Sequence, residues 1–276
     1  MNNLVRVCAP RPLRNWLRSP SRSIQYIRHR LVYGIGIVST LELLPGWSVK
    51  CHPASRSHFQ SFEDDPAQRD ELQAFFSHSS TGMKLLDIGA HHGLFTLAAL
   101  HCGGSPARVI AVEPSTRAAE ILKINLRLNN RADRVCVENI ALGPTDGELK
   151  MLTTGPAGAD YLVVPASTRP DTTCVPQRSL PSLLRETQFQ PTHIKMDVES
   201  CEYEILESSI EVLASLKPTL FLELHGNMLR ARGKDPARVP EMLRAAGYRQ
   251  FLELGRAIDS CELASRKATA RLVCLQ

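Results

Sequence analysis

The sequence lacks several patterns that would each assign it to a particular class of protein. None of its eight cysteines forms a C-x-x-C pair, so neither a disulfide scaffold nor a structural zinc site is indicated. Its longest apolar run, residues 31–44, contains Gly34, Gly36 and Glu42 and falls short of the roughly 20 residues that a membrane-spanning helix needs. We therefore expect a cytoplasmic protein without a transmembrane segment.

Acidic residues are absent from the first 41 positions. Seven arginines occur in that stretch, whereas the net charge of the whole chain is only +5. Residues 1–44 are therefore predicted to form a basic N-terminal arm. Three interpretations of the arm stay open: an organelle transit peptide, a peripheral contact with anionic lipid or nucleic acid, and a leader without fixed structure.

From residue 84 onward, short apolar runs alternate with helical stretches, which predicts an α/β fold with a mostly parallel sheet and helices on both faces. We divide the chain into the arm, an N-terminal cap at 45–83 with a helix at 64–76, and a main domain at 84–276. The Pro- and Thr-rich segment 153–191 is predicted to be an extended connection with one or two short strands. The expected strands are 84–88, 108–112, 135–139, 148–152, 193–198 and 219–225, with a closing hairpin at 248–254 and 271–275; the expected helices are 94–101, 115–129, 203–216 and 236–246.

A cofactor-binding loop is indicated where the first of these strands meets its helix. The segment from Asp87 to Gly93 has the spacing D-x-G-x-x-x-G, and not the G-x-G-x-x-G that places a pyrophosphate at a helix N-terminus. A carboxylate there suits an ammonium group, as in the methionine part of S-adenosylmethionine. Glu113, at the end of the next strand, can accept hydrogen bonds from ribose hydroxyls. The alternatives are a helix cap at Asp87, a solvated strand end at Glu113, and a nicotinamide-dependent oxidoreductase.

A second group of polar residues follows two later strands. Strand alternation places Asp197 and Glu199 on one side, and Glu223 and His225 share a side of the next strand. If the two strands are neighbours, these four residues form the catalytic group, with an acidic or histidine base. The same group could hold a divalent metal, or Lys195 could make it a structural ion network; we expect no metal. We expect His91 to hydrogen-bond within the loop and leave His92 unassigned.

The strings DIGAHHGLFTLAA, VIAVEPS, IALGPTDGELKM, IKMDVESCEYEIL and LFLELH resemble the FkbM family of methyltransferases. The resemblance implies a class I methyltransferase (Rossmann-like) fold with a seven-stranded sheet, S-adenosylmethionine as the donor, and O-methylation. By position, it implies a cofactor site made of Asp87, Gly89, Ala90, His91, Gly93, Glu113, Pro114, Asn139, Ala141 and Asp197. Three departures are His91 for the family's Asn, Ser200-Cys201 for Gly-Ala, and Pro181 for an acid.

The resulting hypothesis is an O-methyltransferase that acts on a hydroxyl of a sugar, glycan or secondary metabolite. A nucleic-acid methyltransferase is the main alternative, but the place of the N-P-P-[YF] string of base-modifying enzymes reads M-D-V-E, and an acidic rim would repel phosphate. A binding module without activity is a third reading, suggested by Pro181 and Ser200. The acceptor and the oligomeric state stay open.

Overall fold

The computed structural model describes residues 38–153, 161–163, 172–199, 201–266 and 269–276. The predictions for Ser200, for most of the Arg-rich arm and for parts of the connection 153–191 lie outside these residues. None of the described helices is long and apolar enough to span a bilayer.

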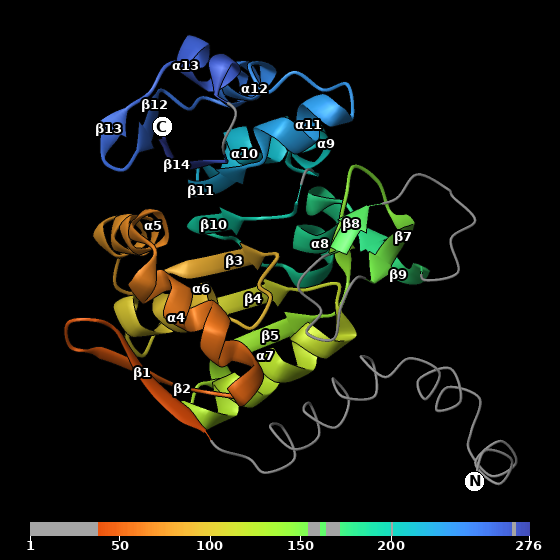
Figure 1. Ribbon diagram of the computed structural model, residues 1–276. Helices are drawn as coiled ribbons and strands as arrows, with labels where there is room; N and C mark the ends of the chain where they lie inside the picture. Colours follow the sequence, from red (N-terminus) through yellow and green to blue (C-terminus); the bar gives the residue numbers. More distant parts are fainter. Residues whose placement is uncertain (1–37, 154–160, 164–171, 200, 267–268) are drawn as a thin grey trace, which may run out of the picture.

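The described part of the chain is built around an eight-stranded sheet with the order β13-β12-β14-β11-β10-β3-β4-β5 (Figure 1). The strands, in chain order, are β3 (Lys84–Ile88), β4 (Arg108–Val112), β5 (Val135–Glu138), β10 (His193–Met196), β11 (Thr219–Leu224), β12 (Gln250–Glu253), β13 (Arg256–Ala257) and β14 (Ala270–Leu275). The first five are parallel, and β14 runs antiparallel between β11 and β12. The predicted mostly parallel α/β sheet is confirmed. The family resemblance implied seven strands in this sheet, and the two-residue edge strand β13 makes eight.

Both faces of this sheet are buried, because the strands alternate apolar residues between two separate cores. On β3, for example, Leu85 packs into one core, while Leu86 and Ile88 pack into the other. Parallel strands covered on both faces read as continuous apolar runs. This explains why β3 and β4 coincide with their predicted ranges.

Helices cover each core. One core contains side chains of α4 (Arg56–Asp64), α5 (Pro66–Ser77), α6 (Leu94–Cys102) and α7 (Thr116–Leu128). The other contains side chains of α8 (Leu180–Thr187), α9 (Glu202–Glu207), α10 (Ile210–Leu216), α11 (Gly226–Ala231), α12 (Arg238–Ala245) and α13 (Ser260–Ser265). Helices on both faces of the sheet are therefore confirmed.

Two predicted elements are wrong. The helix expected at 203–216 is divided into α9 and α10, because Ser208 and Ser209 interrupt it and the Ser208 hydroxyl donates to the Ile205 carbonyl. The connection expected at 153–191 does contain strand, with β9 (Thr172–Arg178) the longest described at seven residues, but it also contains the helix α8, which was not predicted. Ser179 caps α8 and Pro181 lies in its first turn, where proline is favoured. Pro181 is thus explained as part of a helix start.

Two smaller units flank the main sheet. A four-stranded sheet of order β6-β9-β7-β8 adds β6 (Ala141–Leu142), β7 (Gly147–Thr153) and β8 (Tyr161–Val163). The N-terminal unit contains the hairpin β1 (Ser39–Leu44) and β2 (Trp47–Cys51), followed by the short turn η1 (Pro53–Ser55), α4 and α5; a similar turn, η2 (Ala132–Arg134), precedes β5. The hairpin begins inside the range assigned to the arm.

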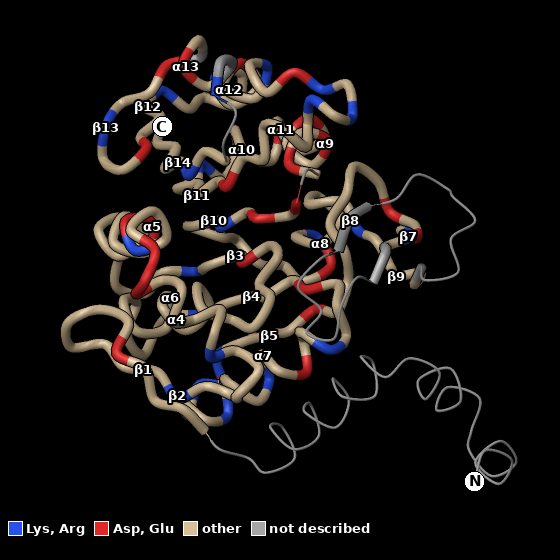
Figure 2. The backbone as a smooth tube through the Cα atoms, in the orientation of Figure 1, with Lys and Arg blue, Asp and Glu red and all other residues tan. Residues whose placement is uncertain are grey.

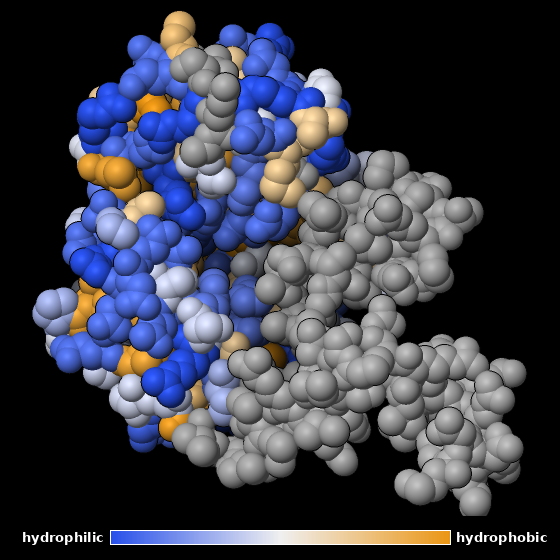
Figure 3. All heavy atoms as spheres, viewed as in Figure 1, coloured by the Kyte–Doolittle hydropathy of each residue, from blue (hydrophilic) through white to orange (hydrophobic). Residues whose placement is uncertain are grey.

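The face of the molecule that Figure 3 shows is mainly hydrophilic. In Figure 3 the hydrophobic residues of the visible face form small, separate patches. Among the described large hydrophobic side chains, the exposed ones are Val38 and Leu254.

Candidate functional site

Asp87 lies near the end of β3, where the chain turns into α6, and it is buried. Its Oδ2 atom accepts a hydrogen bond from the Thr96 hydroxyl at 2.6 Å. Burial raises the pKa of Asp87 to about 6, although the Thr96 hydrogen bond and the charge of Lys195 act in the opposite direction. The carboxylate borders a cavity, so a cationic ligand group there would stabilise its ionised form.

Gly89 brings the loop after β3 against the end of β10. Its φ is +81°, and a Cβ atom at this position would lie 1.7 Å from the carbonyl oxygen of Asp197. Gly93 also has a positive φ, and its Cβ would meet Leu122 of α7 at 3.0 Å. Gly89 therefore allows close contact between two strand ends, whereas Gly93 allows α6 to start against α7.

Glu113 follows β4 and connects it to the same loop. Its two carboxylate oxygens accept backbone N–H bonds from His91 and Ser115, each at 2.7 Å. Burial raises the pKa of Glu113 to about 7, against the lowering effect of these two hydrogen bonds. Each oxygen retains a second acceptor position toward the cavity.

Asn139 holds this strand end in place and does not line the cavity. Its Nδ2 atom donates to the carbonyl oxygens of Glu113 at 2.8 Å and Pro114 at 3.1 Å, and its Oδ1 atom accepts from the Thr116 hydroxyl at 2.9 Å. Pro114 and Ala141, by contrast, do line the cavity. Of the two residues predicted for the adenine side, Ala141 therefore lines the cavity, whereas Asn139 holds the backbone of Glu113 and Pro114 in position.

Three histidines meet at the loop. His91 stacks on His92, with ring centroids 3.8 Å apart, and His58 of α4 approaches His91 edge-on at 4.6 Å. Burial lowers the pKa of His91 to about 2 and that of His58 to about 4, so both rings are neutral at physiological pH. Within the described residues, the buried Nε2 atom of His91 has no hydrogen-bond partner.

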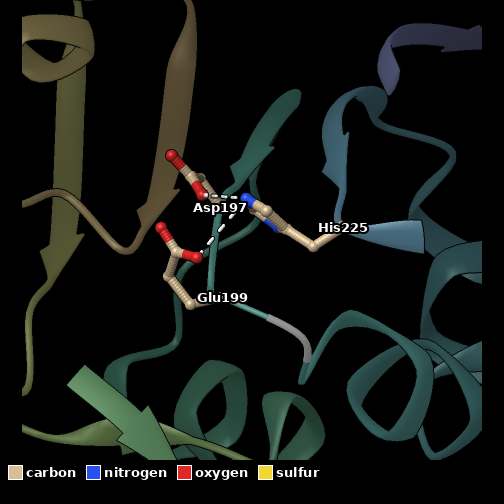
Figure 4. Close-up of side chains that lie close together, drawn as sticks. All are labelled: Asp197, Glu199 and His225. Carbon is tan, nitrogen blue, oxygen red and sulfur yellow. Dashed lines mark ion pairs between the residues drawn. The ribbon is translucent and has the colours of Figure 1, made fainter. Parts of the chain in front are cut away.

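Asp197, Glu199 and His225 come together as an Asp–Glu–His cluster at the ends of β10 and β11 (Figure 4). The Nε2 atom of His225 lies 3.8 Å from Asp197 Oδ1 and 3.6 Å from Glu199 Oε2. On the other side of the ring, Nδ1 lies 2.6 Å from Oε1 of Glu202, which is fully buried. Acidic residues lie near the end of β3, within the strand, and directly after β10 (red in Figure 2).

The charges of this cluster are coupled. Burial alone would lower the pKa of His225, but the hydrogen bond with Glu202 and the charges of Asp197 and Glu199 raise it to about 9. Burial also raises the pKa of Asp197, while Lys195 and His225 oppose that rise. Without another cation in the cluster, His225 is therefore protonated at neutral pH and cannot accept a proton there.

Glu223, predicted to join this group, has other partners. It forms ion pairs with Arg271 at 2.8 Å and with Lys195 at 3.6 Å, and both cations also pair with Glu71 of α5. We call these four residues the ion network. The sequence left a structural network around Lys195 open; the structure places Glu223 in it and keeps Asp197 and Glu199 beside His225.

The cavity has a volume of about 280 Å³. Of the predicted residues, its lining includes Asp87, Gly89, Ala90, His91, Glu113, Pro114, Ala141, Asp197 and Glu199. Sequence reasoning missed the wall residues His58, Phe62, Phe95, Leu149 and Met151. His58 and Phe62 are four residues apart on one side of α4, a spacing that could have indicated a shared face had that helix been predicted.

Residues 87–250 match the family model described as the methyltransferase FkbM domain, which is more than half of the chain. The chain belongs to this family. The family match confirms the resemblance drawn from the sequence motifs, and it spans both the Asp87 loop and the Asp–Glu–His cluster.

Solved structures of the class I methyltransferase fold are similar to this FkbM-family chain at low identity. Methyltransferase FkbM from Methylobacillus flagellatus is 15% identical with a TM-score of 0.47, over 80% of this chain and 54% of that one. This chain therefore spans about half the length of that protein. Precorrin-6Y C5,15-methyltransferase from Geobacter metallireducens is 12% identical with a TM-score of 0.43, over 74% and 87% of the two chains. Among curated proteins, none matches the chain.

Proposed function

We propose that this FkbM-family protein is an S-adenosylmethionine-dependent methyltransferase that binds the methyl donor in the cavity beside Asp87. One observation carries most of this proposal: Asp87 and Glu113 are buried carboxylates at the ends of adjacent parallel strands, and both face one cavity. A dinucleotide would bring its pyrophosphate toward the Asp87 carboxylate, which would repel it. A ligand with an ammonium group and a ribose suits the pair.

The residues around the cavity fit S-adenosylmethionine group by group. Asp87 would hold the ammonium group, and Glu113 would accept hydrogen bonds from the ribose hydroxyls. Pro114, Ala141 and Leu142 supply an apolar wall for the adenine ring, and His91 also lines the cavity. When bound, the cofactor supplies an electrophilic methyl group on its sulfur.

The acceptor in this proposal is a hydroxyl of a small molecule or glycan. An acceptor oxygen in line with the methyl group gains a C–O bond as the C–S bond breaks, and the hydroxyl loses its proton. We assign the promotion of this proton loss to the Asp–Glu–His cluster, because Asp197 and Glu199 are its carboxylates on the cavity wall. Phe62, Phe95 and Met151 give the cavity apolar surface for the body of the acceptor.

Calorimetric titration with S-adenosylhomocysteine and with NAD tests the cofactor assignment. We expect binding of S-adenosylhomocysteine that weakens at least about tenfold in Asp87→Asn and in Glu113→Gln, since each loses a charge-assisted hydrogen bond. Glu120→Gln removes an exposed carboxylate of α7 and is the matched control, with unchanged affinity expected. Binding of NAD without S-adenosylhomocysteine would overturn the proposal.

Transfer of an isotopically labelled methyl group tests the acceptor class. We expect mass spectrometry to find the label on oxygen in a panel of saccharides and hydroxylated metabolites. Label that appears in RNA and in none of the hydroxyl acceptors would contradict the assignment.

A further inference from the structure

The Asp–Glu–His cluster is arranged around a shared space. One ligand atom from each of Asp197, Glu199 and His225 lies within 4.8 Å of the others, and Figure 4 shows the three side chains directed toward one another. The two contacts of His225 Nε2, at 3.6 and 3.8 Å, are longer than hydrogen bonds. Two ligands about 2.1 Å from one cation lie about 3.0–3.5 Å apart, so the two His225 contacts would shorten by a few tenths of an ångström. The carboxylates of Asp197 and Glu199, which can be as much as 4.8 Å apart, would also turn toward the ion.

The histidine of the cluster is held in the manner of a metal ligand. Its side chain is 10% exposed, and its Nδ1 atom is engaged by Glu202, whose side chain has no exposure. A carboxylate at one ring nitrogen orients the other nitrogen toward a metal and raises its basicity. That other nitrogen, Nε2, makes no hydrogen bond to any residue that the structure describes and faces the two carboxylates. A histidine side chain that is nine-tenths buried and aimed at both carboxylates is a second observation, independent of the grouping of the acids.

We propose that Asp197, Glu199 and His225 bind one divalent cation, with Glu202 as the residue that positions His225. Two carboxylate oxygens with one imidazole nitrogen favour a first-row divalent ion such as Mn²⁺ over Ca²⁺, which prefers oxygen ligands alone. Three protein ligands leave coordination positions open, and the two carboxylates border the cavity. The cation would replace any proton on Nε2.

The cation gives the proposed methyl transfer a way to ionise its acceptor; this part rests on the proposed function. An acceptor hydroxyl bound to the cation becomes more acidic, as metal-bound water does. Its proton passes to solvent water, the oxygen then forms the C–O bond, and the C–S bond breaks. The favoured acceptors are therefore molecules whose hydroxyl can reach the ion from the cavity.

The competing arrangement is an ion cluster without a metal, in which a protonated His225 neutralises Asp197 and Glu199. Only the metal site would bind a divalent ion stoichiometrically. We would measure Mn²⁺ binding on the full chain after treatment with a chelator, using the electron paramagnetic resonance signal of free Mn²⁺ and equilibrium dialysis without any methyl donor. We expect one Mn²⁺ per chain.

Variants locate the ion. Glu199→Gln and His225→Ala should each weaken Mn²⁺ binding at least tenfold, and Glu202→Gln should weaken it through the orientation of His225. Glu204→Gln is the matched control, because Glu204 lies on α9 beside Glu202 but pairs with Arg232 at 2.8 Å. Thermal melts without metal establish that each variant folds. If His225→Ala does not fold, Glu199→Gln carries the test, since the Glu199 side chain is 47% exposed.

Two results would overturn the site: no stoichiometric binding of Mn²⁺, or equal affinity in the unmodified chain and in Glu199→Gln. The test is separable from the proposed function. If the protein binds S-adenosylhomocysteine but does not bind Mn²⁺, the metal site alone is wrong. If it binds Mn²⁺ but does not bind S-adenosylhomocysteine, the donor site alone is wrong.

Discussion

At the scale of single residues, Gly89 decides whether the two halves of the candidate site can meet. The backbone of the β3–α6 loop contacts the backbone of Asp197 at a distance that leaves no room for a side chain. Because both partners are backbone atoms, neither can rotate away. The position of the Asp–Glu–His cluster relative to Asp87 therefore depends on this glycine.

We expect Gly89→Ala to destabilise the protein by at least about 2 kcal/mol and to abolish binding of S-adenosylhomocysteine, because the new Cβ adds a clash to a strained positive φ. Urea denaturation and calorimetry measure the two effects. Gly46→Ala is the control: Gly46 has a φ of +80°, but nothing lies within 4 Å of its Cβ position. Equal losses of stability in the two variants would show that the close contact has no role.

The raised pKa of Asp87 predicts how donor binding varies with pH. Burial favours the protonated carboxyl in the free protein, with a pKa of about 6, whereas an ammonium group binds the ionised form. Affinity for S-adenosylhomocysteine should therefore contain a component that falls by up to about tenfold per pH unit below that pKa, beside a component from Glu113, whose pKa is about 7. Titrations from pH 5 to 8 measure this, and Asp87→Asn should lose the component centred near 6. A flat profile in the unmodified chain would contradict the assignment.

At the scale of elements, Asn125 of α7 connects the N-terminal unit to the loop after β3. It is fully buried; its Oδ1 atom accepts from the His52 N–H at 2.7 Å, and its Nδ2 atom donates to Ser55 Oγ and to the carbonyl of His92, both at 2.8 Å. A polar residue between Leu122 and Leu126, on the apolar face of the helix, is the sequence signal for such a role.

Replacing Asn125 by Leu keeps the number and branching of the side-chain heavy atoms but leaves these three groups without their partner. We expect a loss of about 2–4 kcal/mol of stability, and weaker binding of S-adenosylhomocysteine because the loop carrying His91 loosens. Asn129→Leu, one turn later, should cost less than about 1 kcal/mol, since water can replace its contacts with the exposed Lys50 backbone. Denaturant titration of both variants tests the difference, and equal losses would contradict it.

At the scale of the whole molecule, the ion network joins the N-terminal unit to the main sheet. Glu71 comes from α5, Lys195 from β10, Glu223 from β11 and Arg271 from β14. Two positive and two negative charges compensate one another where water is excluded, so removal of one leaves an unpaired buried charge.

We expect Lys195→Met to lower the free energy of unfolding by about 3–5 kcal/mol, because the Lys195 side chain is 2% exposed and pairs with two carboxylates. Arg238→Ala breaks an ion pair whose partners are 62% and 56% exposed, and should change it by less than about 1 kcal/mol. Urea denaturation gives both values. A small effect of Lys195→Met would mean that the network does not stabilise the attachment of α5.

Much of the fold was predictable because its signals are local. Apart from Lys84, Asp87 and Arg108, the runs at 84–88 and 108–112 are apolar, as expected of a strand covered on both faces. Predictions failed where local composition pointed the other way: α8 lies among Pro and Thr residues, and its evidence is a capping serine with three buried leucines. The hairpin of β1 and β2 was hidden because part of it lies in the apolar run 31–44.

The sequence by itself determined the α/β class, the family, and the acids at the ends of β3, β4 and β10, because each depends on residues adjacent in the chain. Only the tertiary structure decided that His225 joins Asp197 and Glu199 while Glu223 turns to Arg271, and that α4 contributes His58 and Phe62 to the cavity. The physical reason is that a side chain's partners are set by the register and order of neighbouring strands and by the packing of distant helices, which a single chain segment does not encode.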